Sequence, residues 1–144
     1  MQRHPKPRAM LAALAASVLL AACGGAEPPP PSSAGVTERI DLPGEYRIAG
    51  VDGVDIDLPH GISAIVSASR IDVHSGCIRF AWSYSYDGQV LTTTSEPVAS
   101  CRRALLPEEQ ALSAAIDAAT AVARTPANGI ELSGAGRSVI LFSQ

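Results

Sequence analysis

The feature that most constrains this fold is an alternation of apolar and polar side chains in the middle of the chain. Its apolar members are Ile78, Phe80, Trp82, Tyr84 and Tyr86, with polar or small residues between them. A period of two residues is typical of a half-buried antiparallel strand, because successive side chains point to opposite faces of a sheet. We interpret the aromatic stripe as core, with a ligand-binding platform as the less favoured alternative.

Turn signals divide the rest of the chain into short segments. Asp87-Gly88 follows the alternating stretch and predicts a tight hairpin with a partner strand from Gln89 to Thr94. Three further turns with glycine are expected at Asp52-Gly53, Asn128-Gly129 and Gly134-Ala135-Gly136, beside short apolar stretches such as 130–132 and 139–142. This pattern predicts a domain that is mostly antiparallel sheet.

One segment has helical spacing instead. Pro107 suits the first helical position, and Glu108 and Glu109 favour the positive end of a helix dipole. The apolar residues that recur at helical spacing are Leu112, Ala115, Ile116 and Ala119. We therefore expect an α+β fold that is mainly β: a curved antiparallel sheet of short, hairpin-connected strands with one amphipathic helix packed against it.

The N-terminal segment has the order of an export signal. A basic stretch precedes an apolar run, from Ala9 to Leu20, that is shorter than the about 20 residues a membrane-spanning helix needs. Leu20-Ala21-Ala22-Cys23 resembles the bacterial lipobox, which predicts cleavage after residue 22 and lipid on Cys23. A soluble periplasmic protein with an unmodified Cys23 is the alternative. Gly24, where an inner-membrane retention signal has Asp, favours an outer-membrane lipoprotein that faces the periplasm.

The composition after the signal indicates a tether and then one domain. Residues 23–36 contain Pro28–Pro31 among Gly, Ser and Ala, a composition that forms no core, so the domain is expected at 37–144. Cleavage before Cys23 leaves eight basic against 14 acidic residues, a net charge of −6. This charge argues against nucleic acid as a partner and predicts that membrane contact comes through the N-terminal lipid alone.

Two cysteines remain once Cys23 is assigned to lipid. Cys77 and Cys101 would lie in a compartment where disulfides persist, so a pair between them is expected. Chain entropy gives such a link about 3 kcal/mol of stabilisation. Two buried thiols are the alternative, because the sequence does not define the geometry.

Several blocks together resemble the META domain, the family that includes HslJ. Gly44-Glu45-Tyr46 resembles the opening Gly-x-Trp of that family, Ser75-Gly76-Cys77 its Gly-Cys-Asn motif and Ala99-Ser100-Cys101 its Met-Ala-Cys motif. The acidic start of the predicted helix and the two closing strands extend the match. The departures are Tyr46 for Trp, Ile78 for Asn and Ala99 for Met. The resemblance implies a role in heat-shock or envelope-stress tolerance, without an agreed reaction.

The residues that could carry chemistry do not form a known motif. Asp52, Asp55, Asp57 and His60 combine metal-binding side chains, but counting from Asp52 the sixth and twelfth positions lack the Gly and Glu of a calcium loop. We therefore interpret them as a solvated turn and predict neither a metal nor a cofactor. Gly134-Ala135-Gly136 precedes a strand, so it is a hairpin turn rather than a phosphate loop.

A nucleophilic site is also disfavoured. His74 and Ser75 are adjacent to the Cys77 region, yet the chain has no Gly-x-Ser-x-Gly elbow. The sequence therefore predicts a non-catalytic envelope lipoprotein that contributes to stress tolerance by binding an unknown envelope protein or ligand. The alternative is an inhibitor or small-ligand-binding module of the periplasm. An enzyme would require a deep polar pocket around His60 or His74.

Overall fold

A computed structural model describes residues 39–144 of the chain. The expected signal peptide (1–22), Cys23 and the tether (23–36) lie outside the described residues. The elements of the described part, in chain order, are β1 (Gly44–Val51), β2 (Val54–Asp55), β3 (Ser63–Val66), β4 (Arg70–Ser75), β5 (Ile78–Tyr86), β6 (Leu91–Glu96), α1 (Pro107–Ala118), β7 (Ala121–Arg124), β8 (Ile130–Gly134) and β9 (Arg137–Ser143).

The strands form one antiparallel sheet that curves until its two ends nearly meet. The order across the sheet is β6-β5-β4-β3-β1-β9-β8-β7, and the short β2 pairs with β1. The ends approach each other at Thr120, just before β7, where the carbonyl accepts the Leu91 N–H of β6 at 3.0 Å. The predicted fold class, a curved and mainly antiparallel sheet with one helix, is therefore confirmed.

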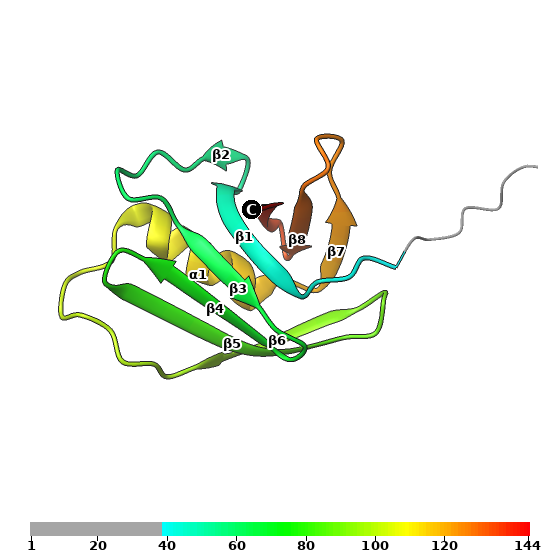
Figure 1. Cartoon of the computed structure of the whole chain (residues 1–144), viewed down its shortest axis with the longest axis horizontal. Helices are drawn as coiled ribbons and strands as arrows, with labels where there is room; N and C mark the ends of the chain where they lie inside the picture. Colours follow the sequence, from blue (N-terminus) through cyan, green and yellow to red (C-terminus); the bar gives the residue numbers. More distant parts are fainter. Residues whose placement is uncertain (1–38) are drawn as a thin grey trace, which may run out of the picture. The chain divides into compact units, whose positions relative to one another are not determined.

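The helix α1 lies on one face of this curved sheet and closes the core (Figure 1). It begins at Pro107, as predicted, and Leu112, Ala115 and Ile116 are buried. At its far end Gly134 of β8 passes so close that an added Cβ would lie 1.9 Å from the Ala118 carbonyl oxygen, which only glycine permits. Within residues 39–144 no helix is long and apolar enough to span a membrane.

The aromatic stripe of β5 faces this core. Trp82 is fully buried, and its indole N–H donates to Asp117 of α1 at 2.6 Å, so the prediction that Trp82 belongs to the core is confirmed. Phe80 stacks on Trp82 with ring centroids 5.9 Å apart. The buried indole therefore keeps a hydrogen-bond partner while its ring fills the space between sheet and helix.

The hairpin after β5 differs from the prediction. The partner strand is β6, Leu91–Glu96, two residues later than the predicted 89–94. The reason is Asp87, whose carboxylate accepts the backbone N–H groups of Gln89 and Val90, both at 2.8 Å, and so holds a longer turn. The other predicted turns are confirmed: Asp52-Gly53 joins β1 to β2, Asn128-Gly129 precedes β8 and Ala135-Gly136 joins β8 to β9.

Candidate functional site

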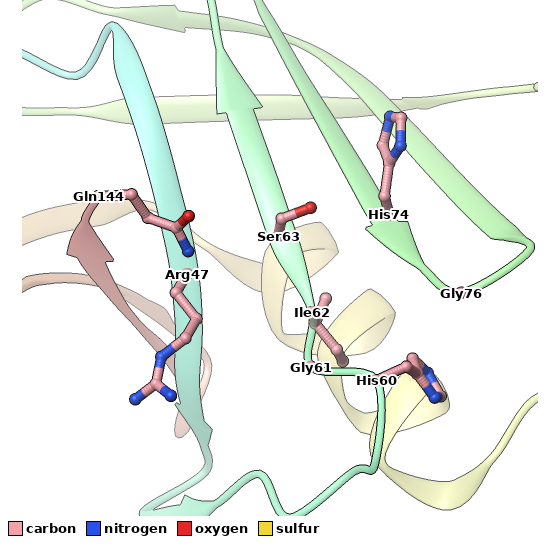
Figure 2. Close-up of a pocket in the computed structure, with 8 residues that line it drawn as sticks. All are labelled: Arg47, His60, Gly61, Ile62, Ser63, His74, Gly76 and Gln144. Atoms are coloured by element: carbon pink, nitrogen blue, oxygen red, sulfur yellow. The ribbon is translucent and has the colours of Figure 1, made fainter.

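A polar cleft lies on the face of the sheet that points away from α1. On β1, β3 and β4 the residues that face the core alternate with residues that face outward, and three polar ones of the outward face, Arg47, Ser63 and His74, lie in the cleft. Its volume is about 350 Å³, within the range of small-molecule sites. We call it the β1–β3–β4 cleft; its lining is Arg47, His60, Gly61, Ile62, Ser63, His74, Gly76 and Gln144 (Figure 2).

Strand register places three of these side chains in one row. Arg47 of β1 is paired with Ser63 of β3, and Ser63 is paired in turn with His74 of β4. Directly opposed residues in antiparallel strands have Cβ atoms about 5 Å apart on the same face of the sheet. Ser63 therefore lies between Arg47 and His74 on its two neighbouring strands, and in Figure 2 the side chains of Arg47 and His74 extend in opposite directions from this row.

His60 reaches the same cleft from the loop that leads into β3. Its Nε2 lies 3.0 Å from the hydroxyl of Ser75, at the end of β4. The His60 side chain is exposed, whereas Ser75 is completely buried. The loop is thus joined to β4 by one hydrogen bond, which fixes His60 beside the cleft.

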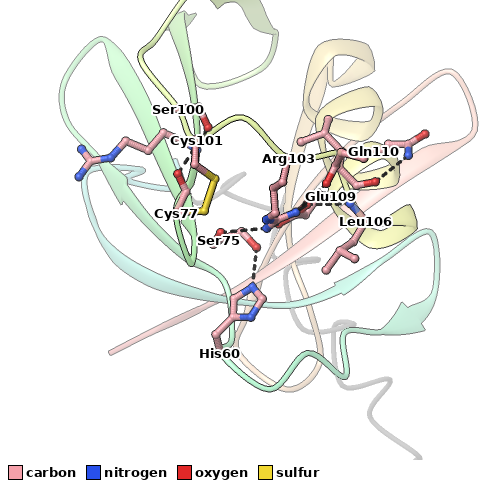
Figure 3. A network of polar contacts seen from close by, with 12 residues as sticks. His60, Ser75, Cys77, Ser100, Cys101, Arg103, Leu106, Glu109 and Gln110 are labelled. Carbon is pink, nitrogen blue, oxygen red and sulfur yellow. Dashed lines mark hydrogen bonds and ion pairs between the residues drawn. A yellow bond between two sulfur atoms is a disulfide. The ribbon is translucent and has the colours of Figure 1, made fainter.

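Beneath His60, a polar network continues into the start of α1 (Figure 3). Glu109, which is fully buried, accepts two hydrogen bonds from Arg103 and one from the Leu106 N–H at 2.8 Å. The Arg103 guanidinium lowers the pKa of Glu109 from its ordinary 4.5 to about 2 against the opposing effect of burial, and hydrogen bonds from Ser75 and Leu106 lower it further. Glu109 is therefore an ionised carboxylate inside the domain at neutral pH.

Ser75 lies between His60 and this ion pair. Its hydroxyl is 3.0 Å from His60 Nε2, and its carbonyl accepts a hydrogen bond from Arg103 at 3.5 Å. In a hydrolytic triad the histidine accepts the serine proton and the acid orients the histidine. Here the carboxylate pairs with Arg103 instead, and Ser75 is closed to solvent.

Cys77 and Cys101 are joined by a disulfide, with Cα atoms 5.6 Å apart, in the usual range for such a bond. The Cys101 N–H also donates to the Cys77 carbonyl at 3.3 Å. Arg103 follows Cys101 by two residues and reaches Glu109 from there. The predicted pairing thus ties the turn between β4 and β5 to the segment that supplies Arg103.

The acidic residues considered for a metal site are used in other ways. Asp52 is paired with Arg137 at 2.7 Å and accepts the Ser138 N–H at 3.0 Å, so it fixes the turn between β1 and β2. Asp55 and Asp57 are exposed. Nowhere in the described part of the chain do three or more His, Cys, Asp or Glu side chains come together as a metal would require.

Sequence reasoning identified His60 and His74 individually but did not bring them together. It missed Arg47 and Ser63, whose positions depend on strands β1 and β3 being neighbours across an 11-residue connection, 52–62. It also missed the pair between Arg103 and Glu109, although Glu three residues after Leu106 is a recognisable signal at the start of a helix.

A second cleft adjoins the first at His74. Its volume is about 360 Å³, and Arg70, Asp72, Arg79 and Phe80 contribute to its walls. Arg70 is paired there with both Asp72 and Glu96, so its charge is already balanced. The second cleft thus combines acidic with basic side chains, whereas the ionisable lining of the β1–β3–β4 cleft is basic throughout.

No protein-family model and no curated protein matches the chain. A solved structure with a similar fold is the NMR structure of a protein from Burkholderia xenovorans, which has 20% sequence identity and a TM-score of 0.46. The match covers 70% of this chain and 81% of that chain. A likeness at this level does not bear on the site.

Proposed function

We propose that this chain is an envelope lipoprotein, anchored through Cys23, whose domain binds a partner in the β1–β3–β4 cleft without catalysing a reaction. The observation that carries the proposal is the row of Arg47, Ser63 and His74 in an open cleft beside His60. Surface polar groups that converge on one cavity are typical of binding sites. Of the two functions considered from sequence, the cleft favours a small-ligand-binding module of the periplasm.

A binding role is supported by the arrangement below the cleft. Within the described residues, the serine hydroxyl recorded within hydrogen-bond distance of His60 is that of Ser75, which is fully buried. A nucleophile must reach its substrate, and its base must be able to accept its proton. Ser75 is closed to solvent and does not meet the first condition, so we assign it to holding His60 in place.

The cellular role that we propose is tolerance of envelope stress, which is what the META-like blocks in the sequence imply. A tethered domain of net negative charge with a basic cleft suits a protein that binds near the membrane surface without lying on it. The lipid on Cys23 would hold the cleft in the compartment where its partner is found.

Complementation of a strain that lacks the gene tests this proposal. Wild-type protein should restore survival under heat and detergent stress, whereas an Arg47→Gln/His74→Gln variant should not, because it removes the guanidinium and the imidazole on the two sides of Ser63. The matched control is Arg124→Gln, an exposed arginine on β7 outside the cleft, which should complement like the wild type.

Immunoblots of membrane fractions must show equal amounts of the three proteins. Full complementation by the cleft variant would refute the assignment of the site. A deletion strain with unaltered stress survival would refute the proposed cellular role.

A further inference from the structure

We propose that the β1–β3–β4 cleft binds the oxyanion group of a small dissolved ligand, such as a phosphate ester. This inference rests on the proposed function, because it names the ligand class of the same site. It comes from the charge and the hydrogen-bond donors that the cleft brings together, and from the size of the cavity.

The ionisable side chains that line the cleft are all basic. They are Arg47, His60 and His74, and neither Asp nor Glu is part of the lining. Three of the eight arginines in the described residues are paired with acidic side chains: Arg70 with Asp72 and Glu96, Arg103 with Glu109 and Arg137 with Asp52. Among residues 39–144, none of these ion pairs involves Arg47. Its five N–H donors are therefore available to a ligand.

The neighbouring groups supply further donors at suitable places. The Ser63 hydroxyl lies between Arg47 and His74 in the strand register, and the side-chain amide of Gln144 is at the edge of the cleft (Figure 2). A guanidinium binds a phosphate or carboxylate with two parallel hydrogen bonds. Arg47 is exposed, so its long side chain has room to turn over Ser63 and complete such a site.

Size and net charge favour a small ligand over a large anionic surface. The cavity of about 350 Å³ is at the lower end of the range for small-molecule sites. Residues 23–144 carry a net charge of −6, which repels polyanions and anionic bilayers over long distances. A small oxyanion can instead be held by the local positive groups, because salt screens charges farther than about 8 Å away at physiological ionic strength.

The test is a phosphate titration of the full chain in a neutral detergent, dodecyl maltoside, followed by NMR of the backbone amides. Sodium phosphate replaces sodium chloride at constant ionic strength. We expect saturable shifts of the Ser63 and His74 amides. The Arg47→Gln/His74→Gln variant should bind at least about tenfold more weakly, since a doubly hydrogen-bonded charge is lost. The control Arg124→Gln should bind within about twofold of wild type.

Two checks separate the alternatives. The fluorescence of buried Trp82 reports whether each variant is folded. Ser63→Ala is a second and milder substitution, at the position between Arg47 and His74. Shifts that fail to saturate, or that are equal in all variants, would overturn the oxyanion assignment. If complementation still depended on Arg47 and His74, the proposed function would stand with a ligand of another class.

The source of the oxyanion is tested with vesicles. We expect no difference in binding between phosphatidylcholine vesicles and vesicles that also contain phosphatidylglycerol, because the domain is acidic. Binding to the anionic vesicles that requires Arg47 and His74, without saturation by dissolved phosphate, would assign the oxyanion to a lipid headgroup and overturn the dissolved-ligand proposal.

Discussion

Arg103 forms a bidentate ion pair with the buried carboxylate of Glu109: Nη1 donates to Oε2 at 2.7 Å and Nη2 to Oε1 at 2.5 Å. The two residues are six positions apart, and the pair fixes the segment before α1 to the first turn of the helix. Arg103 also donates to the Ser75 carbonyl at 3.5 Å, and the Ser75 hydroxyl lies 3.0 Å from His60 Nε2. The ion pair therefore supports His60, which lines the cleft, indirectly through Ser75.

The free energy of unfolding of the domain should depend on pH through the ionisation of Glu109. The pKa of Glu109 is about 2 in the folded domain and near 4.5 when unfolded, so the stabilisation is complete above pH 4.5 and is lost as the pH falls toward 2. Its size is on the order of 2 kcal/mol, because solvent around the partly exposed Arg103 weakens the pair. Urea unfolding at pH 6 and pH 3 measures this loss.

Glu109→Gln should remove most of this acid dependence and lower the stability at pH 6 by about 2–3 kcal/mol, since it leaves Arg103 without its counter-charge. Glu108→Gln is the matched control, an acidic residue in the same helical turn that is only partly buried. It should change the stability by less than about 1 kcal/mol. An unchanged acid dependence in Glu109→Gln would contradict the assignment.

The disulfide should stabilise the domain and the Arg103–Glu109 pair together. Reduction, or the Cys77→Ala/Cys101→Ala variant, should cost about 3 kcal/mol in thermal unfolding. Because Cys101 positions the segment that carries Arg103, this loss and that of Glu109→Gln should be less than additive in a double-mutant cycle. Two titratable thiols in the oxidised protein, or a midpoint that reductant leaves unchanged, would show that no such link exists.

Much of the fold could be predicted from sequence because the local signals agree with one another. The alternation at 78–86, the turn glycines and the start of the helix at Pro107 each reflect a local preference that the sheet and core reinforce. The hairpin at Asp87 was predicted two residues too short, because its length depends on two hydrogen bonds to one carboxylate rather than on a preference of the Asp-Gly pair.

The cleft could not be predicted in the same way. Its row requires that β1 lies next to β3 and β3 next to β4, with a register that pairs Ser63 with both Arg47 and His74. Both β1 and β3 carry alternating patterns, but neither contains a residue that identifies its neighbour. The burial of Glu109 also escaped prediction, because acidic residues in a first helical turn are commonly exposed partners of the helix dipole.

Lipid attachment is a prediction about residues outside the described part of the chain. Intact-mass analysis of the mature protein should show an acylated cysteine, Cys23, at its N-terminus. Cys23→Ala should leave the chain unprocessed or release it from the membrane. Recovery of wild-type protein as a soluble, unacylated chain that is cut elsewhere would rule out the anchor.

The central claim, that the cleft is occupied in the envelope, is tested most directly by the reaction of His74 with diethylpyrocarbonate. Mass spectrometry gives the rate of modification in intact envelopes and on the purified chain. We predict that wild-type His74 reacts about fivefold more slowly in envelopes than on the purified chain. This ratio is expected when about four fifths of the clefts are filled, because only the empty fifth then reacts. In Arg47→Gln, measured in the same two preparations to correct for reagent access, that slowing should largely disappear. Equal slowing in wild type and variant, or none in either, would contradict the claim.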